Sequence, residues 1–173
     1  MILHHPTLLV FAGLPGTGKT AVSRELTRRL GATYIRIDTI EQNLRAAGIA
    51  IGETGYAIAN AVAAENLKLG RIVIADCVNP VFASRQGWRE VAARTSARIV
   101  EIELVCSDQS VHRRRVESRS PDIDGHVLPS WDDVTRCNYE PWNQKHLVLD
   151  SSTHSIDYLV ECVETYVFGV SSQ

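Results

Sequence analysis

The chain has 173 residues, of which 45% are hydrophobic and 22% charged, as expected for an ordinary globular protein folded as one domain, here residues 1–173. Its net charge of −2 excludes the overall positive field that would attract nucleic acid or an anionic membrane. Four scattered cysteines without C-x-x-C spacing argue against a zinc site. The chain also has neither a signal-peptide pattern nor an apolar run of membrane length. Together with the scattered cysteines, this predicts a cytoplasmic protein with reduced thiols.

The first predicted element is a strand over residues 7–12, an apolar run of the kind that is buried on both faces of a sheet. Residues 13–20 follow and match G-x-x-x-x-G-K-[ST], the pattern of a phosphate-binding loop. A four-residue apolar repeat then predicts a helix that ends at Gly31 and carries Val22, Leu26 and Leu30 on one stripe. Strand, glycine loop and helix thus occur in the order that a nucleotide-binding unit requires.

We expect this loop to bind the phosphates of ATP through its backbone N–H groups and the positive end of the helix dipole. Lys19 is expected to reach the β- and γ-phosphates, and the Thr20 hydroxyl to hold Mg²⁺. The predicted nucleotide-binding residues are Gly13, Leu14, Pro15, Gly16, Thr17, Gly18, Lys19 and Thr20.

Asp38 ends the next strand pattern, residues 32–38, and a short helix is expected over residues 39–47. Phosphoryl transfer to an alcohol needs a carboxylate that accepts or orients the hydroxyl proton, which makes Asp38 the candidate base. Alternatively, Asp38-x-x-Glu41 resembles a capping box for the following helix, and the spacing leaves both interpretations open.

An alanine-rich segment, residues 54–69, predicts a largely buried helix, and the strand that follows ends at Asp76. An acid at this position is typical of magnesium binding, directly or through water, although it could also cap the next turn. The helix contains three polar residues that would either contact an acceptor or be satisfied within the fold, namely Tyr56, Asn60 and Glu65.

A turn at Asn79-Pro80, a helix over residues 84–95 and a strand over 98–106 come next, and Ser107 is a plausible N-cap. The helix after it, residues 112–119, is the most basic stretch of the chain. Arg115 and Arg119 are four residues apart and are predicted to project together from a lid, residues 113–130, toward the transferring phosphoryl group. The alternative is a solvated helix face paired with nearby acids.

The remainder predicts an irregular, mobile connection over 120–130, a short helix over 131–139, a strand over 146–150 and a closing helix over 155–168. Aromatic and basic side chains here could line an acceptor pocket or simply pack, namely Trp131, Arg136, Tyr139 and Trp142. Alternating strands and helices predict a parallel sheet, with Asp38, Asp76 and the phosphate loop at the same carboxyl edge.

The strings GLPGTGKT, RID, DCVNP and RRRVESR occur in this order and together resemble the small P-loop kinases of the AAA-type and gluconate kinase group. This group is allied to shikimate, adenylylsulfate and chloramphenicol kinases and to the ATP-binding half of zeta toxins. The resemblance runs from about residue 8 to 150 and implies the three-layer α/β fold of P-loop NTPases. That fold has a five-stranded parallel sheet of order 2-3-1-4-5, helices on both faces and an arginine-bearing lid.

The resemblance also implies site roles. In such enzymes the acid ending the second strand activates or binds the acceptor hydroxyl, which matches Asp38, and RxxxR lid arginines bind phosphates, which matches Arg115 and Arg119. Adenine is expected near residues 150–153. No set of acceptor-binding residues from a named member matches this chain, so the acceptor stays open.

We therefore expect an ATP- and Mg²⁺-dependent kinase that phosphorylates a hydroxyl of a small molecule, as a monomer or homodimer. Its expected catalytic residues are Lys19, Asp38, Arg115 and Arg119, and its expected magnesium ligands are Thr20 and Asp76. A polynucleotide 5′-kinase is the less favoured alternative, because no basic track with stacking aromatics is present. A nucleotide-driven switch without an acceptor is the other alternative.

Overall fold

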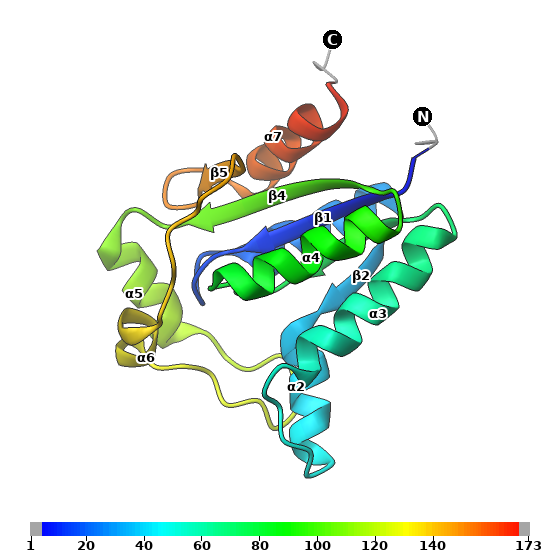
Figure 1. Cartoon of the computed structure of the whole chain (residues 1–173). Helices are drawn as coiled ribbons and strands as arrows, with labels where there is room; N and C mark the ends of the chain where they lie inside the picture. The colour runs from blue at the N-terminus through cyan, green and yellow to red at the C-terminus, as the bar shows by residue number, and fades with distance from the viewer. Residues whose placement is uncertain (1–4, 170–173) are drawn as a thin grey trace.

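The computed structural model describes residues 5–169 and shows a five-stranded parallel sheet with helices on both faces (Figure 1). The strands run in the order β2-β3-β1-β4-β5, which confirms the predicted order. Their bounds are β1 Thr7–Ala12, β2 Thr33–Arg36, β3 Ile72–Asp76, β4 Arg98–Val105 and β5 Leu147–Asp150.

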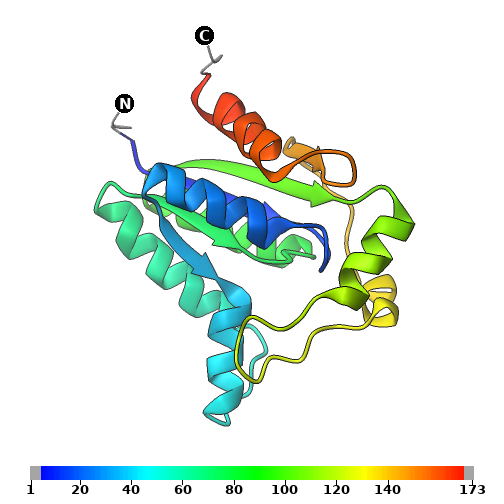
Figure 2. The same cartoon turned by 180° about the vertical axis from the view of Figure 1, so that it is seen from behind.

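The helices divide into those that cover the sheet and those beyond its carboxyl edge (Figures 1 and 2). Two cover one face, α1 Lys19–Leu30 and α7 Ile156–Phe168, and two cover the other, α3 Thr54–Lys68 and α4 Phe82–Arg94. Three lie past the strand ends: α2 Ile37–Ala46, α5 Gln109–Ser118 and α6 Trp131–Arg136. Each covered face has its own apolar core, and the central strand β1 is buried along its whole length. This is why β1 reads as one continuous apolar run.

The start of α2 differs from the prediction, and the difference moves Asp38. Strand β2 ends at Arg36, and Ile37 begins α2 with its side chain buried in the same core as Ile35. Asp38 therefore lies in the first helical turn instead of ending a strand. The N-cap is Arg36, which has no capping side-chain hydrogen bond, so the capping box of Asp38 with Glu41 is wrong.

Helix α5 also differs at both ends. Its N-cap is Asp108, not Ser107, and the Asp108 carboxylate accepts hydrogen bonds from the backbone N–H groups of Ser110 and Val111 at 2.9 and 3.0 Å. The helix ends at Ser118, and Arg119 adopts an extended backbone with ψ of 147°. The prediction that Arg115 and Arg119 project together from one helix is wrong, because only Arg115 is helical.

Helix α3 is less buried than its composition indicates. Ala59 and Ala63 face the core, whereas Ile58 and Val62 on the outer side are 38% and 44% exposed. All four cysteines are free, in agreement with the prediction of reduced thiols. Within residues 5–169, we find no helix with the length and apolar character needed to cross a membrane.

Candidate active site

The predicted phosphate loop joins β1 to α1 and has the backbone that its glycines permit. Gly13, Gly16 and Gly18 have φ of 135°, 85° and 93°, a region that other residues rarely adopt. Gly18 is the N-cap of α1 and offers no side chain to the first-turn N–H groups. A helix N-terminus left open in this way is suited to bind an anion.

Helix α5 packs directly on this loop at Gly16. A Cβ atom there would lie 2.6 Å from Cγ2 of Val116, so only glycine lets the two elements approach this closely. Beside it, the Nε2 atom of His112 lies 2.8 Å from the carbonyl oxygen of Pro15, a hydrogen-bond distance. The shape of the loop is thus supported from outside by α5.

Among residues 5–169, no carboxylate lies in hydrogen-bond contact with Lys19. Its ammonium group is buried and donates to the carbonyl of Leu14 within the loop, at 2.9 Å. Burial lowers the pKa of Lys19, and the nearby carboxylates of Asp76 and Asp38 only partly oppose this. An anion bound in the loop would supply the charge that this lysine lacks.

Asp76 ends β3 beside the end of β1, where the sheet register pairs it with Phe11, two residues before the loop. Its side chain is 3% exposed and accepts a hydrogen bond from the Tyr34 hydroxyl at 2.7 Å. Burial and the Asp76 charge raise the pKa of Tyr34 well above its ordinary value, so Tyr34 stays a donor. The expected position of Asp76 at a strand end next to the loop is confirmed.

Arg36 links Asp38 to the rest of the site. Its guanidinium lies 3.5 Å from the Asp38 carboxylate, 4.0 Å from Asp76 and 2.8 Å from Asp122, and its side chain is 8% exposed. Asp122 belongs to the connecting segment 119–130 and also pairs with Arg24 of α1 at 2.8 Å. The Asp122 carboxylate therefore anchors segment 119–130 to α1 through Arg24 and to the end of β2 through Arg36.

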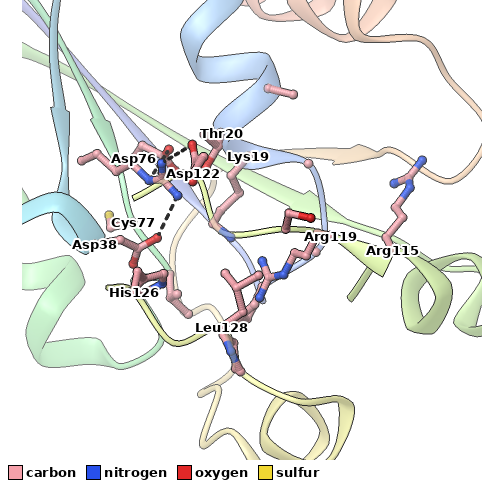
Figure 3. A pocket seen from close by; sticks show the side chains of 18 of the residues that line it. Lys19, Thr20, Asp38, Asp76, Cys77, Arg115, Arg119, Asp122, His126 and Leu128 are labelled. Atoms are coloured by element: carbon pink, nitrogen blue, oxygen red, sulfur yellow. Dashed lines mark hydrogen bonds and ion pairs between the residues drawn. The ribbon is translucent and has the colours of Figure 1, made fainter. Parts of the chain in front are cut away.

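The two arginines predicted to act together diverge (Figure 3). Arg119 points toward Lys19, and its Nε and Nη2 atoms are buried without a hydrogen-bond partner among the described residues. Arg115 points away from Lys19 and donates to the hydroxyl and carbonyl oxygens of Ser151 at 2.8 and 2.9 Å. Arg115 thus holds the loop after β5, where the family resemblance implies adenine, and Arg119 is the arginine directed into the site.

These elements surround a cavity of about 810 Å³. Among the predicted residues that line it are Lys19, Thr20, Asp38, Asp76, Arg115 and Arg119. The sequence interpretation did not assign Arg24, Arg36, Asp122 or His126 to the site and considered Glu41 only as a cap. These residues show no local pattern, because tertiary folding alone brings α1, α2 and segment 119–130 around one cavity.

The other candidates pack elsewhere. Tyr56 stacks edge-on against Trp88 and its hydroxyl accepts a hydrogen bond from the backbone of Asn79, while Glu65 pairs with Lys68 on the surface. Neither they nor Asn60 line the cavity. The alternative that the aromatic and basic residues after the lid pack elsewhere holds as well, since none of them lines this cavity, namely Trp131, Arg136, Tyr139 and Trp142.

Anionic and cationic ligands fit different parts of this cavity. The phosphates of a nucleotide would fit beside the uncapped N-terminus of α1 at Gly18, where they would also meet the side chains of Lys19 and Arg119. Thr20 and Asp76 offer the hydroxyl and carboxylate oxygens that Mg²⁺ takes beside substrate phosphates. No group of three or more His, Cys, Asp or Glu side chains suited to a metal occurs within residues 5–169, and Mg²⁺ bound by phosphates and water needs no such group.

Comparison with known proteins gives a family and a fold. The family model described as "AAA domain" matches residues 8–133. Uncharacterized proteins of Mycobacterium tuberculosis and Mycobacterium bovis are 32% identical to the chain over 116 residues, which cover 57% of it. The chain matches 23% of the length of these relatives.

Solved structures with about 20% identity share the whole architecture. A putative kinase from Chloroflexus aurantiacus superposes with a TM-score of 0.75 over 98% of this chain and 100% of that one, at 20% identity. The APS kinase CysC of Mycobacterium tuberculosis, in complex with AMPPNP and APS, gives 0.70 over 95% and 99%, at 20% identity. Kti12 of Chaetomium thermophilum, in complex with ADP-AlF3, gives 0.71 over 96% and 100%, at 20% identity. The fold is that of the P-loop NTPases.

Proposed function

The chain belongs to the AAA domain family, and from this premise we propose that it is a kinase that transfers the γ-phosphoryl group of ATP to a hydroxyl of a small molecule. The observation that supports this most strongly is the cavity itself. It is an open cavity lined by a phosphate loop, a strand-end acid, a second acid on α2 and an unpaired arginine from segment 119–130. A binding module would need the loop alone, whereas the facing acid and arginine suit group transfer.

In this proposal the loop N–H groups and Lys19 bind and orient the β- and γ-phosphates. Thr20 and Asp76 would hold Mg²⁺, which would supply positive charge against the charge of the phosphates. Arg119 places its free N–H groups on the transferred phosphoryl group, and segment 119–130 serves as a lid that excludes water. Arg115 contributes indirectly by fixing the loop after β5.

Asp38 accepts the proton of the acceptor hydroxyl as the oxygen–phosphorus bond forms and the bond to ADP breaks. Its side chain is 39% exposed and has one weak contact, to Arg36 at 3.5 Å, so its oxygens remain accessible to a ligand. The first turn of α2 fixes the backbone of Asp38, and an aspartate side chain has few rotatable bonds. Both limit the positions that its carboxylate can take, as a proton acceptor requires.

The experiment is to compare the wild type with Asp38→Asn. We expect acceptor-dependent ADP formation to fall about a hundredfold or more, while the dissociation constant for Mg–ATP measured by calorimetry stays within about twofold. Asp157→Asn is the matched control, since this carboxylate lies on α7 and pairs with Arg29 on the surface. Equal turnover of the Asp38 variant and the wild type would remove Asp38 from the base role.

A nucleotide-dependent switch is the second candidate. The fold is as similar to that of Kti12, which was solved with ADP-AlF3, as it is to that of the APS kinase, with TM-scores of 0.71 and 0.70. The same assay separates the two functions. A kinase forms a phosphorylated product in proportion to ADP, whereas a switch hydrolyses ATP without an acceptor-derived product.

A further inference from the structure

The cations of the cavity fall into two groups that differ in their partners. Near the phosphate loop, Lys19 and Arg119 make no ion pair with a carboxylate among the described residues. On the side formed by α2, the adjoining part of α1 and residues 120–130, which we call the acceptor side, each lining arginine has one. Arg24 pairs with Asp122 at 2.8 Å, and Arg45 pairs with Glu41 at 3.4 Å. The positive charge that is free to meet an anion is thus concentrated where phosphates would bind.

Arg36 is the most buried arginine of the acceptor side. Both of its terminal nitrogens already contact carboxylates, while its buried Nε atom has no hydrogen-bond partner among the described residues. Arg36 contacts Asp122 at 2.8 Å, Asp38 at 3.5 Å and Asp76 at 4.0 Å, with a side chain only 8% exposed. Burial alone would lower the pKa of Arg36, but the hydrogen bond to Asp122 and the three carboxylate charges outweigh burial and raise it. A carboxylate or phosphate on the acceptor would have to displace one of these acids and would lie beside the others.

The acceptor side instead offers carboxylate oxygens. Glu41 is one helical turn after Asp38 on α2, and both line the cavity. Gly55 of α3 makes room for Glu41, since a Cβ there would lie 2.7 Å from Cγ and 3.2 Å from Oε1 of Glu41. Among the described residues, the Glu41 carboxylate accepts one long hydrogen bond, from Arg45 at 3.4 Å. Burial and the charge of Asp38 raise the pKa of Glu41 against the effect of Arg45.

Residues 120–130 complete this side with the Asp122 carboxylate, a histidine nitrogen and an apolar surface. Nδ1 of His126 is buried and has no hydrogen-bond partner among the described residues. Figure 3 draws His126 beside Asp38 and on the opposite side of Lys19 from Arg115. Val127, Leu128 and Pro129 follow it and line the same cavity. A ligand here meets acceptor oxygens, one imidazole nitrogen and apolar atoms.

We propose that the acceptor is a polyhydroxylated molecule without an anionic group, whose hydroxyl or ammonium groups donate hydrogen bonds to Asp38 and Glu41. This inference rests on the proposed kinase function and narrows its substrate class. Hydroxyl and ammonium groups satisfy the carboxylates that the chain leaves short of donors, whereas a carboxylate, sulfate or phosphate would be repelled by them.

The test uses pairs of acceptors that share a carbon skeleton and differ in one anionic group. They are glucitol against gluconate, methyl shikimate against shikimate, and glucose against glucuronate, with glucosamine added as an ammonium-bearing analogue of glucose. ADP release and phosphorylated product are measured at saturating Mg–ATP. In every pair that is turned over, we expect the uncharged or ammonium-bearing member to have at least a tenfold higher kcat/KM.

A second arm tests Glu41 directly. Glu41→Gln should lower kcat/KM for the best acceptor of the panel about tenfold through its KM, with the KM for ATP unchanged, whereas a purely structural role would change both constants or the melting temperature. Glu65→Gln is the matched control, because this surface carboxylate pairs only with Lys68 among the described residues.

Preference for the anionic members, or no turnover of any uncharged or ammonium-bearing compound by a protein that binds Mg–ATP, overturns the inference. Phosphorylation of anionic members alone would leave the proposed kinase function standing. Failure to bind Mg–ATP would instead remove the kinase function and this inference with it.

Discussion

Two cations, buried Lys19 and half-buried Arg119, define the site at the scale of single residues. Burial lowers the pKa of both side chains, and a neighbouring arginine adds to this in each case, Arg119 beside Lys19 and Arg36 beside Arg119. Neither cation forms an ion pair with a carboxylate among the described residues. Holding like charges in a desolvated cavity costs stability, and a bound anion recovers that cost. The residues that make the ligand-free protein less stable are thus those that give affinity for phosphate.

A substitution at Gly55 separates stability from function. Alanine in a helix usually stabilises a protein by about 0.5–1 kcal/mol relative to glycine, because the unfolded chain loses entropy. Gly55→Ala should not show that gain, since its Cβ would lie 2.7 Å from Cγ of Glu41 and must displace it. We expect an unchanged or lower melting temperature and a raised KM for the acceptor.

The control for this prediction is the same change in a Glu41→Ala background, where the displaced side chain is missing. There Gly55→Ala should raise stability and leave the acceptor KM as it is in Glu41→Ala. Equal effects in both backgrounds would show that Gly55 does not act through Glu41.

At the scale of elements, segment 119–130 depends on Asp122 for its position over the cavity. The hydrogen bond from Arg36, and then the charges of Arg36 and Arg24, lower the pKa of Asp122 from 3.8 to about 2, against the effect of burial. Because the folded pKa is the lower one, this carboxylate stabilises the fold above pH 3.8 and loses its contribution as the pH falls toward 2.

Asp122→Asn tests this anchor. The Asp122 side chain is 42% exposed, so solvent screening reduces its contribution to about 1 kcal/mol. We expect the variant to be less stable than the wild type at pH 7 by this amount in urea unfolding, and the difference to vanish near pH 2. A difference that is independent of pH would show that Asp122 acts without its charge.

Arg85 joins helix α4 to the segment between α6 and β5. This side chain is 1% exposed and donates to the carbonyls of Asn79, Pro80, Glu140 and Pro141 at 2.8 to 3.1 Å. It also lies over the rings of Tyr139 and Trp142, with centroid distances of 5.2 and 4.1 Å. Arg85 therefore explains why these aromatic residues pack away from the cavity, and it fixes the loop that follows Asp76.

Arg85→Met should be strongly destabilising, because it leaves the carbonyls of Asn79, Glu140 and Pro141 without this donor, while that of Pro80 keeps the backbone N–H of Glu140. We expect a loss of about 3 kcal/mol, seen as a fall in melting temperature of roughly 10 °C by calorimetry. Arg94→Met in the last turn of the same helix is exposed and serves as the control, with little change expected. A small loss for Arg85→Met would mean that water replaces the guanidinium.

At the scale of the whole molecule, the phosphate loop with its flanking strand and helix could be predicted because its signals are local, whereas the sheet order was implied by the resemblance to the small P-loop kinases. Each local pattern predicts the structure of its own segment. The apolar run at 7–12 forms a strand, the G-x-x-x-x-G-K-[ST] spacing forms the loop, and Gly31 ends the helix. The strand end at Asp76 followed in the same way. These features needed no knowledge of what lies across the fold.

The acceptor side could not be predicted, because its residues meet only through tertiary folding. Ile37 continues an apolar strand pattern in sequence yet starts a helix, since its side chain fills the core under α3. Arg36 and Asp122 are 86 residues apart and lie in segments without periodicity. Arg119 reads as helical until the extended backbone after Ser118 turns it into the cavity.

The central claim is that this cavity binds a nucleotide through the phosphate loop. Calorimetric titration with Mg–ATP tests it most directly, with Lys19→Ala as the variant and Lys68→Ala as the surface control. We predict binding to one site and, at about a hundredfold excess over the dissociation constant, a stabilisation of roughly 3 kcal/mol that raises the melting temperature. Lys19→Ala should weaken binding about tenfold or more, and Lys68→Ala should not. Titration of the wild type without heat and without a shift in melting temperature would contradict the account.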